Sequence, residues 1–287
     1  MERRRRKIFL HKIALTVLCI LFGTALFSLI GFLFASEAIA NSAKVPIENM
    51  ECDFCDELIE SVKKEEAEAA AAERAKRIAE AVGIIYLTFD DGPGDYTNAL
   101  LDVLEKYDVK ATFFVTGRGD DDVIKREFDE GHRVALHTWS HNYSYIYSSI
   151  DNYFADLDQV ADRVKRITGE NAELIRFPGG SSNTISTRYD RRTRIMTTLT
   201  REVETRGYQY FDWNVDSDDA GRARTPDEVF NNVTSRLKAG PNVVLQHDIK
   251  DYSVDAVERI IEYGQSHNFY FDKLSGDSFT AHHSVNN

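Results

Sequence analysis

Two short segments of the chain carry residue types that together could bind a metal ion. An apolar run ends in two adjacent carboxylates and a Gly-Pro turn in Tyr86-Leu-Thr-Phe-Asp-Asp-Gly-Pro-Gly94. The segment His137-Thr-Trp-Ser-His141 begins 46 residues after the second aspartate and places two imidazoles four residues apart. On one helical turn or in a compact loop, both imidazoles can face one ion. With Asp91 they supply three ligands and leave a position open for water, as in catalytic zinc sites.

The other carboxylate of the pair, Asp90, is not one of these three ligands. A carboxylate bound to a metal stays an anion, whereas Asp90 remains free to take a proton as a general base. A lone histidine or an isolated Asp-Asp turn would indicate only a hydrogen-bonded or solvated residue. The combination of strand, paired aspartates and paired histidines favours a reactive site.

The elements that must position these residues alternate between short apolar runs and amphipathic stretches. Strands are expected at 84–89, 111–115, 132–136, 174–177, 208–213, 243–246 and 268–271. Helices are expected between them at 97–107, 121–130, 151–168, 190–206, 226–238 and 254–266. Such alternation implies parallel strands joined by crossover helices. About seven units of this kind predict an α/β fold, a closed or nearly closed (β/α)7-type barrel.

Polar residues follow several of these expected strands. They are Asp90 and Asp91 after the first strand, His137 after the third, Arg176 at the end of the fourth, Asp216 to Asp219 after the fifth and His247 after the sixth. In parallel α/β architectures the reactive residues gather at the carboxyl ends of the strands. The sequence therefore predicts that all of these side chains meet at one edge of the sheet.

The N-terminal region has the pattern of a membrane segment. Residues 1–12 carry a net charge of +5, and residues 13–35 are 23 residues without a charge. About 20 apolar residues suffice to cross a bilayer, and the basic flank should remain in the cytoplasm. We expect a single-pass anchor with the rest of the chain outside. A signal peptide cleaved near Ala38-Ile-Ala40 is the alternative, which would give a secreted protein.

The remainder of the chain is acidic and divides into three parts. Residues 36–82 read as a stalk whose segment 57–82, rich in Ala, Glu and Lys, should be a solvated helix; residues 83–273 form the main domain; residues 274–287 are a polar tail, expected to be loosely ordered. Cys52 and Cys55 could form a local disulfide or remain free thiols, since two thiols cannot complete a structural zinc site. The charge of −17 outside the first twelve residues excludes nucleic acid as a partner. The oligomeric state has no signature in the sequence.

Five segments in a fixed order give the chain a family resemblance. They are Thr88-Phe-Asp-Asp-Gly-Pro93, His137-Thr-Trp-Ser-His141, Arg176-Phe-Pro-Gly-Gly180, Asp216-Ser-Asp-Asp219 and Leu245-Gln-His247. In this order they resemble the motifs of the polysaccharide deacetylases of carbohydrate esterase family 4. The resemblance covers about residues 84–271 and implies a metal-dependent enzyme with a distorted barrel of parallel strands and helices.

The resemblance also implies a role for each matched residue. Asp90 would be the catalytic base, oriented by Arg176, and His247 the general acid, supported by Asp219. The metal ligands would be Asp91, His137 and His141. Two nitrogens and one oxygen suit a single divalent ion, with zinc expected and cobalt, nickel or manganese as alternatives. Leu245 would form an apolar wall of the site.

Two positions depart from the family pattern. Gly179 stands where the third motif often has an aromatic residue, although its backbone N–H can still bind an oxyanion. Ala220 stands where a tryptophan often follows the fourth motif, and Trp213 could supply the missing apolar surface. Asp212 and Asp216 compete with Asp219 as the partner of His247.

The resemblance and the anchor together predict what the enzyme acts on. Hydrolysis of N-acetyl groups from N-acetylglucosamine in peptidoglycan is the preferred expectation, because the domain would face the cell wall. Chitin oligosaccharide, an exopolysaccharide or acetylated xylan are alternatives within the same chemistry. An inactive glycan-binding wall module is the alternative from another class.

Overall fold

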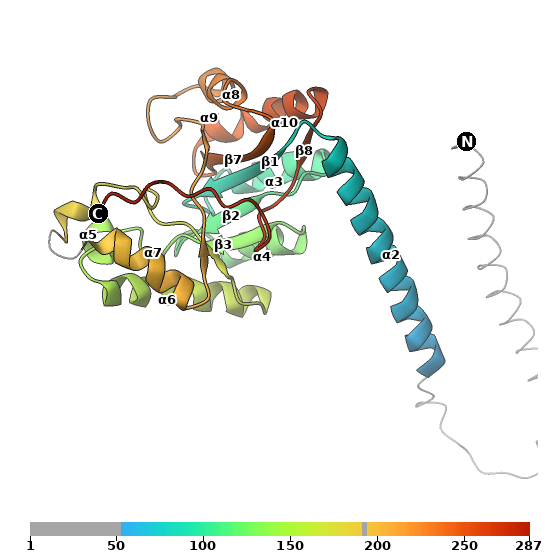
Figure 1. Ribbon diagram of the computed structural model, residues 1–287, viewed down its shortest axis with the longest axis horizontal. Helices are drawn as coiled ribbons and strands as arrows, with labels where there is room; N and C mark the ends of the chain where they lie inside the picture. The colour runs from blue at the N-terminus through green and yellow to red at the C-terminus, as the bar shows by residue number, and fades with distance from the viewer. Residues whose placement is uncertain (1–52, 191–193) are drawn as a thin grey trace, which may run out of the picture. The chain divides into compact units, whose positions relative to one another are not determined.

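The computed structural model describes residues 53–190 and 194–287 (Figure 1). The chain divides into two compact units, residues 1–66 and 67–287. Helix α2 (Asp53–Glu80) starts in the first unit and ends in the second, and it confirms the helix expected at 57–82. No described helix is long and apolar enough to cross a membrane. The apolar segment 13–35 and the pair Cys52 and Cys55 lie outside the residues whose side chains are described.

A parallel sheet forms the centre of the second unit. Its strands are β1 (Gly83–Asp90), β2 (Thr112–Val115), β3 (Arg133–Leu136), β4 (Leu174–Ile175), β5 (Gln209–Tyr210), β6 (Val215–Asp216), β7 (Gly240–His247) and β8 (Phe269–Phe271). The order across the sheet is β5-β4-β3-β2-β1-β7-β6, and β8 also pairs with β1. Strand β1 is the hub, because β7 pairs with its whole length, β8 with its start and β2 with its end.

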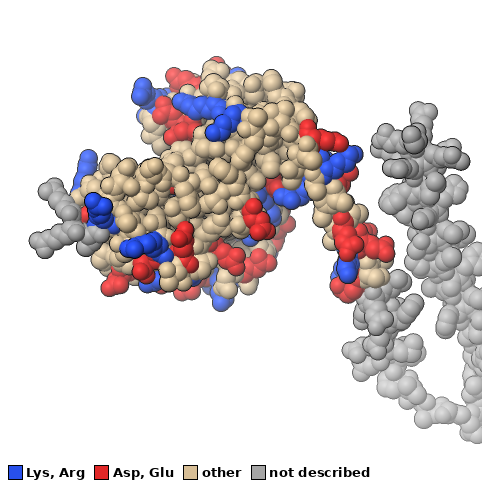
Figure 2. Space-filling view, in the orientation of Figure 1, with Lys and Arg blue, Asp and Glu red and all other residues tan. Residues whose placement is uncertain are grey.

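Helices surround the sheet. They are α3 (Thr97–Lys106), α4 (Asp121–Asp129), α5 (Tyr143–Ile146), α6 (Ile150–Thr168), α7 (Ile195–Thr205), α8 (Pro226–Thr234), α9 (Asp251–Val254) and α10 (Val257–Ser266), with a 3-10 turn at Ser186–Arg188. In Figure 1, α8 and α10 lie beyond β7, and α6 and α7 lie on the opposite side of the sheet. Charged side chains gather over these outer helices, and fewer lie over the middle of the same view (Figure 2).

The side chains on the two faces of β1 pack into different clusters. Ile85, Leu87 and Phe89 are at most 1 % exposed and pack into the core shared with the helices. Side chains alternate along a strand, so Tyr86, Thr88 and Asp90 point to the other, inner face. There Tyr86 packs in a second cluster with Phe114, Phe211 and Leu274. The inner face is therefore apolar at the start of β1 and polar at its carboxyl end, where the site lies.

The sheet is a half-barrel, consistent with the (β/α)7-type barrel that the sequence predicted, and it is open because the edge strands β5 and β6 do not pair with each other. The strand expected at 208–213 is shorter than predicted, because only Gln209–Tyr210 pairs as β5. Beyond it, the carbonyls of Phe211 and Asp212 accept hydrogen bonds from the buried Arg176 guanidinium at 3.0 and 3.1 Å. A side chain thus satisfies backbone groups that a neighbouring strand would otherwise use.

The sequence did not predict the short elements α5 and β6, and the remaining differences concern element ends and the tail. The helix expected at 254–266 begins at Val257 as α10 and follows the short helix α9, and the helix expected at 226–238 stops at Thr234. The tail is not loose as expected: Leu274 is buried, Asp212 N–H donates to Ala281 O at 2.8 Å, and the Asn287 amide donates to Asn183 O at 2.8 Å. Polar side chains in the tail therefore bond to the domain and not only to water.

Candidate active site

Asp90 lies at the carboxyl end of β1 in contact with a buried guanidinium. Arg176 Nη1 donates to Asp90 Oδ1 at 2.7 Å and to Thr88 Oγ1 at 2.8 Å. Arg176 is fully buried and Asp90 is 3 % exposed. The guanidinium also lies 4.1 Å from the centre of the Phe114 ring, a cation–π contact. Two buried opposite charges compensate each other, so one oxygen of Asp90 is fixed and the other faces the neighbouring side chains.

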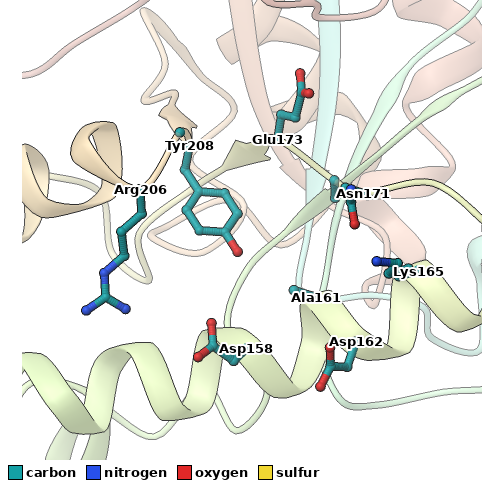
Figure 3. Close-up of a pocket in the computed structure, with 10 residues that line it drawn as sticks. Asp158, Ala161, Asp162, Lys165, Asn171, Glu173, Arg206 and Tyr208 are labelled. Atoms are coloured by element: carbon teal, nitrogen blue, oxygen red, sulfur yellow. The ribbon is translucent and has the colours of Figure 1, made fainter.

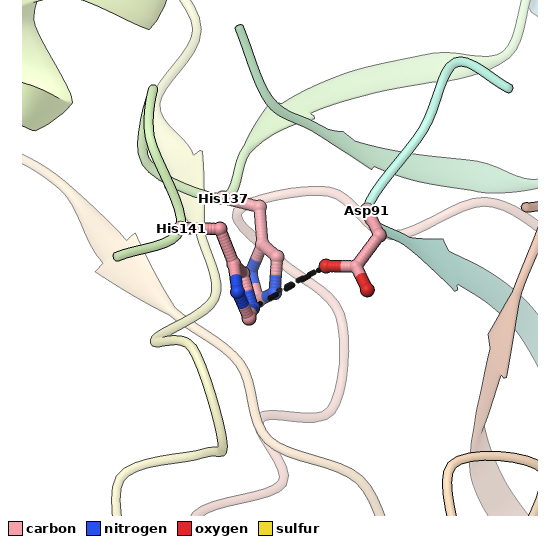
Figure 4. A group of neighbouring side chains, drawn as sticks. All are labelled: Asp91, His137 and His141. Atoms are coloured by element: carbon pink, nitrogen blue, oxygen red, sulfur yellow. Dashed lines mark ion pairs between the residues drawn. The ribbon is translucent and has the colours of Figure 1, made fainter. Parts of the chain in front are cut away.

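Asp91, His137 and His141 form the group that the sequence predicted as metal ligands (Figure 4). Asp91 Oδ1 lies 3.6 Å from His137 Nε2 and 3.3 Å from His141 Nε2. All three donor atoms lie within 4.8 Å of one another. Asp91 has a φ of 76°, so the backbone turns directly after β1, and its carboxylate lies beside both imidazoles. Two adjacent residues at the end of β1 therefore have different partners: Asp90 bonds to Arg176, and Asp91 lies beside the two histidines.

These residues fit a divalent metal ion. Asp91 Oδ1 is buried and has no hydrogen-bond partner in the described part of the chain, which is costly unless a cation compensates it. His137 Nδ1 donates to the Arg176 carbonyl at 2.9 Å, which leaves Nε2 free as a ligand atom. Burial and the neighbouring His137 lower the pKa of His141 to about 4, so its imidazole is neutral at neutral pH. Two nitrogens and one oxygen then meet in one place.

The two histidines are joined by a compact loop and not by a helical turn. Thr138 and His141 have φ values of 66° and 50°, which no helix allows. The buried carboxylate of Asp156, on α6, accepts hydrogen bonds from the N–H groups of Trp139 and Ser140 at 2.6 and 2.9 Å. Helix α6 therefore fixes the loop, and with it the spacing of the imidazoles.

His247 ends β7, and its partner is Asp219. Its Nδ1 donates to Asp219 Oδ1 at 2.7 Å, and its backbone N–H donates to Asp219 Oδ2 at 2.8 Å. The other two candidates bond elsewhere: Asp212 accepts from Ser181, and Asp216 accepts from the Trp213 indole. Burial lowers the pKa of His247, but the hydrogen bond and charge of Asp219 outweigh burial and raise it above the ordinary value of 6.5.

A cavity of about 460 Å³ joins the two halves of the site. Its walls contain these predicted residues: Asp90, Asp91, His137, His141, Gly179, Trp213, Leu245 and His247. Arg176 and Asp219 stand behind this wall as buried partners of Asp90 and His247. Ala220 also lines the cavity, so Trp213 provides the apolar surface that Ala220 cannot. The structure thus brings together the ten residues that were predicted to form the site.

Two further hollows lie outside the catalytic group. One of about 640 Å³ shares Trp213 and Asp216 with the cavity and is otherwise lined by residues such as Arg236, Phe279 and His283. The other, of about 540 Å³, lies between α6 and the chain around Glu173 and Tyr208 (Figure 3). None of the predicted site residues lines this second hollow, so it carries no part of the chemistry proposed below.

Three residues of the site had no signal in the sequence analysis. Tyr143 and Lys250 line the cavity. Burial, with the charges of Asp91 and Asp90, raises the pKa of Tyr143 to about 12, so its hydroxyl stays protonated. Asp248 lies behind the cavity, where burial raises its pKa to about 7. Only the position of Asp248, directly after His247, could have suggested it.

Asp248 explains the glycine that follows the two aspartates. Its Oδ2 accepts a hydrogen bond from Thr97 Oγ1 at 2.5 Å. A Cβ on Gly92 would lie 2.1 Å from the same oxygen. Glycine is therefore required here for close approach, and the contact holds the turn after Asp91 against the end of β7.

Comparison with known proteins agrees with this geometry. Residues 78–197 match the polysaccharide deacetylase family. A peptidoglycan-N-acetylglucosamine deacetylase from Bacillus cereus is 32 % identical over 203 residues, which are 68 % of this chain and 70 % of the relative. The chain belongs to the polysaccharide deacetylase family. It is therefore a hydrolase, a polysaccharide deacetylase with a half-barrel of parallel strands.

Solved structures of polysaccharide deacetylases share the fold. The catalytic domain of a peptidoglycan N-acetylglucosamine deacetylase from Eubacterium rectale is 50 % identical, with a TM-score of 0.68, covering 71 % of this chain and 94 % of that one. A polysaccharide deacetylase from Bacillus cereus is 30 % identical, with a TM-score of 0.61, covering 70 % and 96 %.

Metal titration tests the division of the two aspartates. We expect the protein to bind one divalent ion, and Asp91→Asn to weaken zinc binding at least about tenfold, because a charged ligand is lost. Asp90→Asn is the matched control and should leave zinc affinity nearly unchanged, since Asp90 bonds to Arg176. Isothermal titration with zinc measures both. Equal loss of affinity in the two variants would contradict the ligand assignment.

Proposed function

We propose that this polysaccharide deacetylase removes N-acetyl groups from N-acetylglucosamine residues of peptidoglycan. One observation carries the proposal: a base fixed by Arg176 and an acid fixed by Asp219 line one cavity with a three-ligand metal group. The relatives named above support the substrate, because two of them are called peptidoglycan N-acetylglucosamine deacetylases. The neighbouring hollow that shares Trp213 provides room for further sugars of a polymer.

The metal group would be held by Asp91, His137 and His141. When bound, a divalent ion supplies positive charge that makes water more acidic and a carbonyl more electrophilic. Zinc suits two imidazoles and one carboxylate, and cobalt, nickel or manganese would also fit. Identification of the ion requires metal analysis of the purified protein.

Asp90 begins the reaction as general base. Its Oδ1 is held by Arg176, while its Oδ2 lies 3.7 Å from His137 Nε2 and so faces the metal group. This oxygen accepts the proton of the water that attacks the acetyl carbon. The Gly179 N–H stabilises the oxygen that gains negative charge, an effect typically worth about 3 kcal/mol per donor. Gly179 has a φ of 76°, and its N–H bonds to no residue within 53–190 or 194–287, so it is available for this purpose.

His247 completes the reaction as general acid. Asp219 accepts the Nδ1 proton and thereby leaves Nε2 to carry the proton that the substrate receives. An amine leaves poorly unless it is protonated, so His247 transfers this proton to the sugar nitrogen as the C–N bond breaks. The products are acetate and a glucosamine residue. Base and acid are thus separate groups, each held by its own buried partner.

Chitin is the second candidate substrate, because a relative from Colletotrichum lindemuthianum named chitin deacetylase is 30 % identical over 186 residues. An exopolysaccharide or xylan would use the same chemistry. The inactive glycan-binding module has less support, because base, acid and ligands are all in place. We also propose that residues 13–35 anchor the chain in the cell membrane, with the domain outside. The uncharged run of 23 residues supports this location, and secretion after cleavage is the alternative.

Acetate release from defined peptidoglycan and chitin oligomers tests the function directly. We expect release that a chelator abolishes and added zinc restores, with peptidoglycan preferred. Asp90→Asn should keep the metal and lose activity by at least about 100-fold, because the base is absent. Substantial turnover by a metal-loaded Asp90→Asn protein would overturn this mechanism, and release from chitin alone would replace the proposed substrate.

The pH dependence of the reaction tests the His247–Asp219 pair. His247 must be protonated to act as acid, so kcat/KM falls as the pH rises through its pKa. Because Asp219 raises that pKa, removing its charge in Asp219→Asn should lower it. The alkaline limb of the profile should then shift to lower pH. A limb that stays in place, or moves to higher pH, would assign this limb to another group.

A further inference from the structure

Tyr143 is a cavity residue that the reaction described above does not use. It is the first residue of α5 and follows the ligand His141 by two positions. Its ring lies edge-on to the His141 ring, with centroids 5.2 Å apart, and 5.9 Å from the ring of Tyr147. Tyr147 is buried and donates to Pro178 O at 2.7 Å. Tyr143 is therefore fixed between the histidine loop and the segment that contains Gly179.

The Tyr143 hydroxyl occupies the space beside Gly179. A Cβ built on Gly179 would lie 3.2 Å from Tyr143 Oη and 3.5 Å from its Cε1. The position where the third family motif often has an aromatic residue thus has no side chain of its own, and an aromatic side chain from another element lies against it. The ring of Tyr143 provides the wall that Gly179 does not.

Two hydrogen-bond donors are consequently close together. Gly179 and Tyr143 both line the cavity that contains the metal group, and neither the Gly179 N–H nor the Tyr143 hydroxyl bonds to another residue in the described ranges. A tyrosine hydroxyl donates one hydrogen bond, and because Tyr143 is half-buried, leaving its hydroxyl without a partner is costly unless substrate or water satisfies it. Both donors are available to the same oxygen atom of a bound substrate.

We propose that the Tyr143 hydroxyl donates a hydrogen bond to the acetyl oxygen of the substrate, beside the Gly179 N–H. This inference rests on the proposed function, because it assigns Tyr143 a role in the same reaction. The hydroxyl acts most strongly when that oxygen becomes negative, so it stabilises the transition state more than the bound substrate. Tyr143 is then a catalytic residue supplied by α5. It adds a side-chain donor beside Gly179, which can donate only through its backbone N–H.

The test removes the hydroxyl and keeps the ring. Tyr143→Phe should lower kcat on the glycan oligomer about 100-fold, the effect typical of one lost oxyanion donor, with KM nearly unchanged. Zinc content should remain that of the wild type, because the ring still packs against His141. Tyr145→Phe is the matched control: Tyr145 lies on the same helix, is 40 % exposed and is absent from the cavity wall. Its kcat should not change.

Three results would decide the proposal. Unchanged kcat in Tyr143→Phe would overturn it. Loss of zinc, or an equal loss of activity in Tyr145→Phe, would also overturn it, because the tyrosine would then only support the fold. An aryl acetate separates this inference from the proposed function, since it carries the acetyl group without the sugar. If the wild type releases acetate from the aryl ester but from no glycan, the substrate proposal fails; a 100-fold loss on the ester in Tyr143→Phe would still support the hydroxyl.

Discussion

The buried ion pair between Arg176 and Asp90 is the interaction on which the site depends. One guanidinium bonds to the end of β1 through Asp90 and Thr88, and to the carbonyls of Phe211 and Asp212 beyond β5. The backbone carbonyl of Arg176 also accepts the Nδ1 proton of His137. Removing one partner of a buried pair typically costs about 3 to 5 kcal/mol, because the other charge is left uncompensated. A single residue thus fixes the proposed base, orients one proposed ligand and links opposite parts of the half-barrel.

This arrangement gives adjacent aspartates different chemistry. Asp90 points along the inner face of β1 toward Arg176, whereas the left-handed turn at Asp91 directs the next carboxylate to the histidines. Opposite them, Asp219 fixes His247 by accepting from both its ring and its backbone. Each reacting group is held by a buried partner before substrate arrives, which limits the reorganisation needed during catalysis.

The sequence predicted the residues at strand ends well, because the pattern of strands and helices determines which strand ends share an edge. The family resemblance favoured Asp219 as the partner of His247, but the residues alone left Asp212 and Asp216 as competitors, since a few residues of loop decide which carboxylate reaches His247. The sequence also left open whether the barrel closes, because spacing does not reveal that Arg176 bonds to carbonyls where strand pairing would continue. Tyr143 was missed for a similar reason: its approach to Gly179 depends on how α5 packs, and no local pattern encodes that contact.

The central claim is that Arg176 holds Asp90 beside the metal group as the base, while Asp91 binds the ion. A crystal structure of the zinc-loaded protein, with anomalous scattering recorded at the zinc edge, tests this most directly. The account predicts one ion bound by Asp91, His137 and His141 at about 2 Å, with Asp90 still bonded to Arg176. An ion that takes Asp90 as a ligand, or that binds away from the histidines, would contradict it.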